Sequence, residues 1–369
     1  SRQFQFRPVF LYLRGIAKGY LGDPLSAIED LEEVVRRDKN YVPAYANLAL
    51  GYGQMGWMGH AWRHVENYLR RDPDNEYEAR EHVEELANLA ETEISESANV
   101  FGVSPRKMRQ AAMPHERAQI CLQKEDYRGV QKETKTAIRL VPNWPSPRNN
   151  RGMAFFLDGN LEKAIAEHKT VLEELDPENL YALGSLVVLY VNNWETEKAE
   201  VYAEKLRSHI LGNLPDLSHM EKSIEAFGWL EDDDTLAEIA STVSIEDWPL
   251  QPYNLYTLGA GAANAGKRMI AKRLFKEVTQ FGGVYDSLAQ QGLKALKRAN
   301  RRQDRPLGTG LDGRLPTIHF AHYWRGSTLE RLLRAMESGK DLSEFVERHP
   351  YIGYGLRLML WQRLDEALD

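Results

Sequence analysis

Apolar residues recur at helical spacing between positions 44 and 74, where a glycine and a proline interrupt them. Leu48 and Tyr52 lie four residues apart, so they would share one apolar face of a helix. Gly56 then permits a tight turn, and Pro73 would stop a second helix. This pattern predicts two antiparallel helices in a unit of about 34 residues.

The same unit recurs along most of the chain, because small residues return with one period. Ala27 and Ala61 are 34 positions apart, and so are Val130 and Ala164. The unit around Ala164 ends one residue late, at Pro177. Two helices alone cannot bury their apolar faces, so the units must stack on one another. The sequence therefore predicts an all-α array of helix pairs with almost no strand.

Eight such units fit between residues 8 and 284, and we assign the repeat array to residues 1–284. Two units match the pattern poorly. In residues 76–110 a helix rich in Glu and Ala is followed by a stretch that loses the pattern, where we expect a distorted second helix or a loop. In residues 214–251 two helices flank an acidic turn at 231–234.

On these small residues, turn glycines and prolines, residues 8–284 resemble a tetratricopeptide-repeat protein. The resemblance implies an α-solenoid in which antiparallel helix pairs form a right-handed superhelix. It also implies that the first helix of each pair lines a concave groove, which in this family typically binds a peptide or a partner protein. The family fixes the architecture and the style of interaction, and it implies no reaction.

In this family six positions of each first helix tend to face the groove. Here these positions hold many amides and aromatics and few charges. Amide side chains can pair with the backbone of a bound peptide, and tyrosine offers contact area with a polar tip. Some of these residues would instead be solvated or pack between repeats. The candidate groove residues are Tyr12, Tyr20, Asn47, Gln54, His115, Gln119, Gln123, Asn149, Asn150, Phe156, Tyr181, Asn192, Tyr253, Tyr256 and Asn264.

A carboxylate clamp, as in repeat domains that bind chaperone C-termini, is not expected. It needs Lys or Arg at groove positions where the first repeat has Val9, Tyr12 and Ile16, although Asn47 does match. We therefore expect a partner to be held through amides and aromatics, with a modest dependence of binding on salt.

Residues 285–369 are interpreted as a C-terminal helical cap or extension, with a Gly/Pro loop at 303–316. The helix before this loop ends in a basic run. The run could meet nucleic acid or an acidic protein surface, but the helix dipole also favours cations at a solvated helix C-terminus. The basic residues are Lys294, Lys297, Arg298, Arg301, Arg302 and Arg305.

Composition narrows the classes of function. With 43% apolar residues the 369-residue chain can bury a core, and its net charge of −7 argues against a general nucleic-acid binder. The single cysteine, Cys121, excludes an intramolecular disulfide and falls at a core position, where we expect an inert buried thiol. A single cysteine fits a reducing compartment, so we expect a cytoplasmic protein. No apolar run reaches the length of a membrane span, and the start at Ser1 suggests a trimmed chain.

Two motifs carry weak chemical signals. Gly308, Gly310 and Gly313 match a phosphate-binding pattern, but no strand is expected before them and no helix after them, so a flexible loop is favoured. His319 and His322 lie one helical turn apart, but a metal site needs three or four ligands, so packing or surface histidines are favoured. We find no nucleophile signature, and we expect no catalytic residue, cofactor or metal.

The leading hypothesis is a non-catalytic scaffold or adaptor that binds a protein or peptide in its concave groove as part of a larger assembly. The alternative is a regulatory or sensor region that contacts nucleic acid through the basic patch at 294–305. A third hypothesis is a hydrolase or metalloenzyme built from the C-terminal tail.

Overall fold

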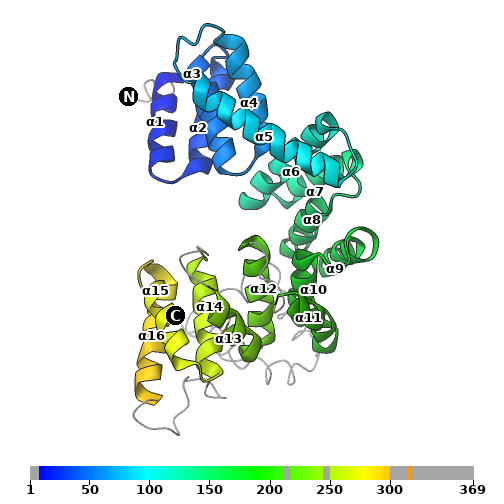
Figure 1. Ribbon diagram of the computed structural model, residues 1–369, viewed down its shortest axis with the longest axis vertical. Helices are drawn as coiled ribbons and strands as arrows, with labels where there is room; N and C mark the ends of the chain where they lie inside the picture. Colours follow the sequence, from blue (N-terminus) through cyan, green and yellow to red (C-terminus); the bar gives the residue numbers. More distant parts are fainter. Residues whose placement is uncertain (1–7, 194, 211–216, 244–249, 300–313, 318–369) are drawn as a thin grey trace, which may run out of the picture. The chain divides into compact units, whose positions relative to one another are not determined.

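The computed structural model describes residues 8–193, 195–210, 217–243, 250–299 and 314–317 (Figure 1). Among these residues there are sixteen α-helices and one π-helical turn, and no strand. The prediction of an all-α chain built from helix pairs is confirmed. The chain divides into two compact units, residues 1–151 and 152–369, and the division falls inside α8.

In the first unit, consecutive helices pack as antiparallel pairs (Figure 1). α1 packs against α2, α3 against α4, and α6 against α7, while α5 contacts both α4 and α6. The bounds are α1 (Pro8–Tyr20), α2 (Pro24–Arg37), α3 (Val42–Gln54), α4 (Met58–Arg71), α5 (Arg80–Val100), α6 (Pro105–Gln123), α7 (Tyr127–Leu140) and α8 (Pro145–Leu157).

In the second unit, α10 packs against α11 and α14 against α15. α12 lies against both α10 and α14, α13 packs on α14, and α16 packs on α15. The two helices predicted around the acidic turn are thus present as α12 and α13. The bounds are α9 (Leu161–Thr170), η1 (Val171–Leu175), α10 (Leu180–Asn192), α11 (Thr196–Ile210), α12 (Leu217–Leu230), α13 (Asp233–Thr242), α14 (Pro252–Asn264), α15 (Arg268–Val278) and α16 (Gly283–Ala299).

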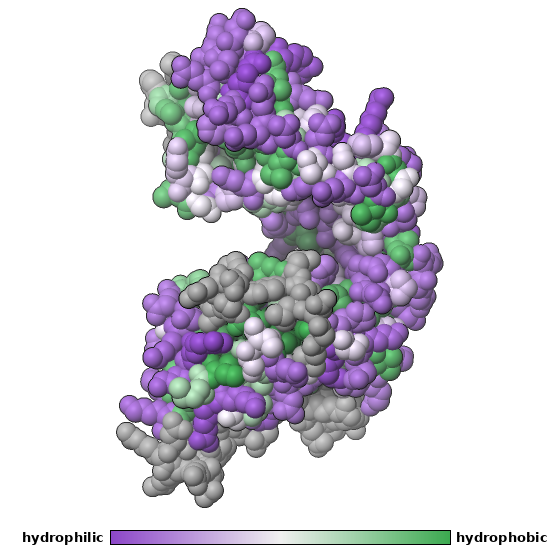
Figure 2. All heavy atoms as spheres, in the orientation of Figure 1, coloured by the Kyte–Doolittle hydropathy of each residue, from purple (hydrophilic) through white to green (hydrophobic). Residues whose placement is uncertain are grey.

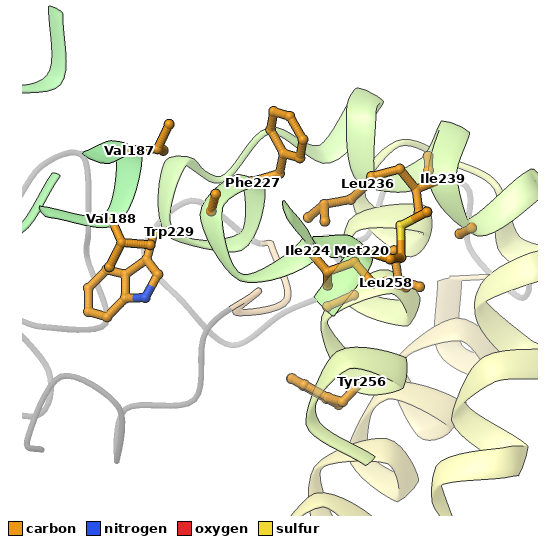
Figure 3. Packing of buried hydrophobic residues seen from close by; sticks show 14 of the residues in the cluster. Val187, Val188, Met220, Ile224, Phe227, Trp229, Leu236, Ile239, Tyr256 and Leu258 are labelled. Atoms are coloured by element: carbon orange, nitrogen blue, oxygen red, sulfur yellow. The ribbon is translucent and has the colours of Figure 1, made fainter. Parts of the chain in front are cut away.

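The core of the second unit includes the place where α12, α13 and α14 meet (Figure 3). Met220 and Ile224 of α12 are fully buried there, beside Leu236 of α13 and Leu258 of α14. Burial of large apolar side chains is the main favourable term in packing one helix on another. This core fixes the relative positions of the three helices that carry the site described below.

Glycines close the turns inside the helix pairs, as the repeat pattern predicts. Gly22, Gly56, Gly159 and Gly266 have φ values of 79°, 70°, 83° and 77°. This left-handed region favours glycine because a side chain would crowd the following carbonyl group. Between α6 and α7 the corresponding residue is Glu125, with φ 57°, so this pair makes the same turn with a less suited residue.

The small residues of the pattern lie where helices touch. Ala61, Ala164 and Ala271 have no exposed surface, and Ala27 is 5% exposed. Interiors are packed densely enough that a larger side chain at such a position must displace a neighbour. The structure therefore gives these residues the close contact that the repeat pattern predicts for them.

Residues 95–110 differ from the distorted helix or loop expected there. α5 extends into this stretch, and α6 begins after a short turn in which Gly102 has φ 63°. The Ser104 hydroxyl accepts a hydrogen bond from the Lys107 main-chain N–H at 3.2 Å, and Pro105 occupies the first turn of α6. A capping serine followed by proline is a strong helix start, so the chain makes two long helices instead.

The late end of the unit around Ala164 also has a structural cause. α9 runs directly into the π-helical turn η1, in which the Asp176 N–H donates to the Val171 carbonyl at 2.8 Å. A π turn closes its hydrogen bond over five residues rather than four, so it absorbs one extra residue without ending the helix. The next helix, α10, then resumes the pattern.

Candidate functional site

Four residues from beyond the repeat array, Arg314, Leu315, Pro316 and Thr317, lie against α12, α13 and α14. We call them the internal segment. The Leu315 N–H donates to Asn264 Oδ1 at 2.8 Å, and Asn264 Nδ2 donates to the Leu315 carbonyl at 2.9 Å. One amide side chain thus satisfies both backbone groups of one residue. The Leu315 side chain is 8% exposed and belongs to the core cluster of the second unit.

Two carboxylates hold the guanidinium group of Arg314. Its Nε and Nη2 donate to Asp233 Oδ2 at 3.0 and 2.5 Å, and its Nη1 donates to Glu231 Oε2 at 2.9 Å. Nη2 also donates to the Glu231 carbonyl at 3.0 Å. Charge-assisted bonds to a planar fork of donors select arginine over lysine, because the directions of the donors are fixed.

Thr317 is held at the other end of the internal segment. Its hydroxyl donates to the Gly228 carbonyl near the end of α12 at 2.8 Å, and its own carbonyl accepts from the Thr257 hydroxyl of α14 at 2.9 Å. Thr257 and Thr317 are both buried. Buried polar groups need such partners, because losing water without a replacement costs about 1–3 kcal/mol. The internal segment is thereby paired along its length.

The partners of the internal segment come from three places in the second unit. α12 supplies a carbonyl, the α12–α13 turn and the start of α13 supply two carboxylates, and α14 supplies a hydroxyl and an amide. We call this set the segment site, and it consists of Gly228, Glu231, Asp233, Thr257 and Asn264.

Electrostatics make the segment site dependent on a cation. The pKa of Asp233 is raised to about 6, mainly by burial; the hydrogen bond from Asn264 and the charge and hydrogen bond of Arg314 lower it, and the charge of Glu231 raises it. A buried carboxylate beside a second carboxylate is unfavourable unless a positive group compensates both. Arg314 supplies that compensation from the internal segment.

The acidic turn at 231–234 is anchored from a second direction. Asp232 caps α13 by accepting from the Thr235 N–H at 3.1 Å, and Arg207 of α11 donates to Asp232 Oδ2 at 2.8 Å. Asp232 thus pairs with Arg207, whereas its neighbours Glu231 and Asp233 pair with Arg314. One arginine, Arg207, is part of the repeat array, and the other belongs to the internal segment.

The other candidate groove residues of the second unit are largely buried. Tyr256 is 2% exposed and packs against the rings of Phe275 and Tyr285, with centroids 5.8 and 6.1 Å away. Tyr253 also lies 5.9 Å from Tyr285. Asn192 is buried, and its Nδ2 donates to the carbonyl of Val188 in its own helix at 2.8 Å. Tyr256 thus packs inside its own helix pair, against α15, and against α16.

Tyr181 of α10 lies beside a buried ion pair. The Lys222 ammonium is 5.4 Å from the centre of the Tyr181 ring and donates to Glu225 Oε2 at 2.8 Å. Lys222 is only 6% exposed, so this cation is enclosed by protein. The ring face of tyrosine attracts such a cation, which fixes Tyr181 on the α12 side of its helix.

In the first unit, the candidate groove residues differ in exposure. The Tyr12 hydroxyl accepts from Asn47 Nδ2 at 3.0 Å, which joins α1 to α3. His115 is buried against Trp144, with ring centroids 4.5 Å apart, and burial lowers its pKa to about 4. Tyr20 is 91% exposed. Gln54 and Gln123 are also exposed, Gln119 and Asn150 are half-buried, and Asn149 is buried. Phe156, on the part of α8 that belongs to the second unit, is half-buried.

Three solved structures are similar to this chain. A tetratricopeptide repeat protein from Parabacteroides merdae is 15% identical with a TM-score of 0.38, over 80% of this chain and 99% of that one. The P58(IPK) TPR domain is 13% identical with a TM-score of 0.26, over 81% and 90%. The human IFIT1 dimer with m7Gppp-AAAA is 16% identical with a TM-score of 0.34, over 91% and 73%. No protein-family model matches the chain, and no curated protein does.

The fold is tetratricopeptide-like. This assignment rests on the helix pairs, the turn glycines and the buried alanines of this chain, and not on the three similar structures. Within this tetratricopeptide-like array, Asn264 is a candidate groove residue that contacts the internal segment. It stands near the end of a first helix, at a position that the resemblance assigns to the groove.

Sequence reasoning missed four residues of the segment site, and it missed Arg314. Thr257 occupies a groove position of the same first helix as Asn264, so the resemblance provided a signal for it. Glu231 and Asp233 were recognised only as part of an acidic turn, and Gly228 acts through its backbone carbonyl. Arg314 was placed in a Gly/Pro loop. It is 81 residues from Asp233, so no local pattern connects the two.

Several candidate motifs lie outside the described residues. These are the glycine motif at 308–313, the His319 and His322 pair, and three of the basic-patch residues, Arg301, Arg302 and Arg305. The other three basic-patch residues, Lys294, Lys297 and Arg298, are exposed on α16.

The remaining sequence-based expectations are addressed by the described part of the chain. Cys121 is half-buried rather than fully buried, and partial burial raises the pKa of its thiol, which keeps it protonated. No group of three or more His, Cys, Asp or Glu residues arranged to hold a metal occurs among the described residues. No helix in that part of the chain is long and apolar enough to cross a membrane.

Proposed function

We propose that this chain is a non-catalytic scaffold that binds a peptide segment of a partner protein at the segment site. The observation that carries the proposal is the pairing of the Asn264 amide with both backbone groups of Leu315, at 2.8 and 2.9 Å. An extended peptide must find partners for each buried N–H and C=O, and a groove amide supplies them regardless of the peptide's side chains.

The surroundings of this amide would add specificity. Glu231 and Asp233 accept a guanidinium group, the core cluster takes an apolar side chain, and Gly228 accepts from a hydroxyl group. Backbone pairing supplies affinity, whereas such side-chain pockets distinguish one peptide from another. Both are present at the segment site.

The hydropathy of the surface favours hydrogen-bonded recognition at the segment site over docking on a broad apolar face. Figure 2 shows that hydrophilic residues cover much of the face in that view, with apolar residues in small groups. Interfaces that depend on apolar area use large contiguous patches, and none is visible among the coloured residues of that face. The proposed mode needs only one short segment and the five residues of the segment site.

A peptide library displayed on phage and selected against the full chain tests this proposal. The affinity of selected peptides is then measured for the wild-type chain and for Asn264→Ala, which should weaken binding about tenfold or more. Asn99→Ala is the matched control, because Asn99 is an exposed asparagine of α5 in the other unit. Its affinity should equal that of the wild type.

The same measurements address the groove candidates and the nucleic-acid alternative. A variant with Asn149→Ala, Asn150→Ala and Tyr181→Ala tests whether a bound partner extends over the candidate groove residues of α8 and α10. A variant with charge reversal at Lys297 and Arg298 tests the basic patch. If Asn264→Ala and the triple variant bind as the wild type does, while charge reversal abolishes binding, the basic patch is the site and the peptide proposal is wrong.

A further inference from the structure

We propose that the internal segment is a pseudo-ligand: it occupies the segment site of its own chain and must leave before a partner peptide of similar chemistry can bind. This inference rests on the proposed function and names the class of partner. The partner peptide presents an arginine, then an apolar residue, and two positions later a threonine or serine. The order follows Arg314, Leu315 and Thr317.

The contacts of the internal segment are those of a bound peptide. Its two backbone anchors, at Leu315 and Thr317, pair with the side chains of Asn264 and Thr257. These two anchors join backbone groups of the segment to side chains, and the Thr317 hydroxyl adds one bond to a helix carbonyl, that of Gly228. Bonds to side chains that stand ready on rigid helices can be given to another chain with the same backbone geometry.

The requirement for arginine follows from the carboxylates. The side chains of Glu231 and Asp233 are only 12% and 17% exposed with Arg314 in place. Without Arg314 the two neighbouring carboxylates would lose the guanidinium that pairs with both, which is costly. A guanidinium satisfies two carboxylates and the Glu231 carbonyl at once, whereas a lysine ammonium lacks the fixed fork of donors. The site therefore favours an arginine from one chain or the other.

The remaining positions of the peptide follow from the same contacts. Leu315 enters the apolar core of the second unit, so a leucine-sized side chain is required. Proline is suitable at the next position, because Pro316 has no N–H that would need a partner. The Thr317 hydroxyl donates to the Gly228 carbonyl, which also accepts from the Glu231 N–H at 3.1 Å. A threonine or serine therefore fits, and a valine would remove one of the two donors to that carbonyl.

Attachment to the same chain gives the internal segment an advantage over any free peptide. A tethered ligand has a high effective concentration at its site, set by the length of the connecting chain. A free peptide therefore binds only to the fraction of molecules whose site is vacant, and its apparent affinity falls by that fraction. Weakening the internal segment alone should then increase binding, and weakening the site in such a variant should remove the increase.

The experiment compares variants of the two partners in the Arg314–Asp233 ion pair. A fluorescent peptide with the sequence of residues 311–320, LDGRLPTIHF, is titrated with the full chain, and anisotropy is read. Arg314→Ala should bind the peptide about tenfold or more tightly than the wild type. Asp233→Ala alone weakens the internal segment and the free peptide alike and should change the affinity little, whereas adding Asp233→Ala to Arg314→Ala should lose the gain. A peptide carrying Arg314→Glu should not bind to any of these chains.

Two controls keep the test independent of folding. Arg128→Ala removes an exposed arginine of α7 in the other unit and should leave peptide affinity unchanged. Thr317→Val removes one hydroxyl from the internal segment with almost no change of volume, and it should tighten peptide binding as Arg314→Ala does. In the wild-type chain, excess unlabelled peptide should speed hydrogen exchange at the Leu315 amide, because the internal segment is displaced.

Some results would overturn the inference. If Arg314→Ala and Thr317→Val bind the peptide no better than the wild type does, and the Leu315 amide stays protected, the internal segment is a structural brace. If library-selected peptides still need Asn264 in that case, the peptide-binding function stands and only self-occupancy is lost. If selected peptides do not need Asn264, the proposed function itself is wrong, whatever the 311–320 peptide does.

Discussion

Asn264 and Leu315 are 51 residues apart in the chain, and the Asn264 amide exchanges two hydrogen bonds with the Leu315 backbone, at 2.8 and 2.9 Å. The second proton of Asn264 Nδ2 is directed to Asp233 Oδ1 at 3.1 Å. Each polar atom of this amide therefore has a partner, which fixes its orientation. An aspartate at the same position could accept a hydrogen bond but could not donate one.

We therefore predict that Asn264→Asp releases the internal segment. The new carboxylate cannot donate to the Leu315 carbonyl and lies beside the carboxylate of Asp233, so two favourable bonds become repulsive. Hydrogen exchange at the Leu315 amide should accelerate by about tenfold or more. Asn99→Asp, at an exposed site on α5, serves as the control. Unchanged protection of Leu315 in Asn264→Asp would contradict the role assigned to the amide.

A second prediction concerns the close contacts between helices. Ala61 and Ala164 have no exposed surface, so Ala61→Trp or Ala164→Trp has no space for the added ring. Overpacking of this kind costs roughly 1–3 kcal/mol or more. Ala166, two residues from Ala164 on α9, is exposed, and Ala166→Trp should be nearly neutral. Melting temperatures of the three variants give the comparison, and equal values for Ala164→Trp and Ala166→Trp would refute the assigned register.

A third prediction concerns the residue with positive φ in the turn of a helix pair, which is glycine at Gly56 and glutamate at Glu125. Gly56 has φ 70°, and a Cβ added there would meet no atom within 4 Å, so Gly56→Ala acts through backbone strain alone. It should lower the free energy of unfolding by about 1–2 kcal/mol. Glu125 has φ 57° at the corresponding turn, so Glu125→Gly should stabilise by up to about 1 kcal/mol. Denaturant titration of both variants tests the opposite signs.

A fourth prediction concerns acid. Burial lowers the pKa of His115 from 6.5 to about 4, so the unfolded chain takes up this proton at a higher pH than the folded chain does. The contribution of His115 to stability is complete above pH 6.5 and is lost as pH falls toward 4. It amounts to about 3 kcal/mol.

Comparison of variants isolates this histidine from the other groups that titrate. His115→Phe preserves an aromatic ring against Trp144 and should show a shallower loss of unfolding free energy between pH 6.5 and 4. His82→Phe changes an exposed histidine of α5 and should follow the wild-type curve. Parallel curves for wild type and His115→Phe would show that His115 is protonated in the folded chain.

The sequence by itself determined the repeating helix pair. Ala27 and Ala61 recur 34 residues apart, as do Val130 and Ala164, because each stands at a contact between two helices. The turn glycines recur because only one backbone conformation closes the pair. These requirements act over a few residues, and each unit repeats them, so one chain shows them several times. For the same reason the late end at Pro177 was visible as a register shift, although its π-helical cause was not.

Only the tertiary structure decided what the groove positions do. Tyr256 and Asn264 both occupy groove positions of α14, but Tyr256 packs against α15 and α16, whereas Asn264 binds the internal segment. Periodicity assigns a side chain to one face of a helix, whereas its partner depends on which distant residue reaches that face. Arg314 and Asp233 are 81 residues apart, and their pairing depends on the stacking of α12, α13 and α14. A contact between residues so far apart leaves no period in the sequence, because it occurs once.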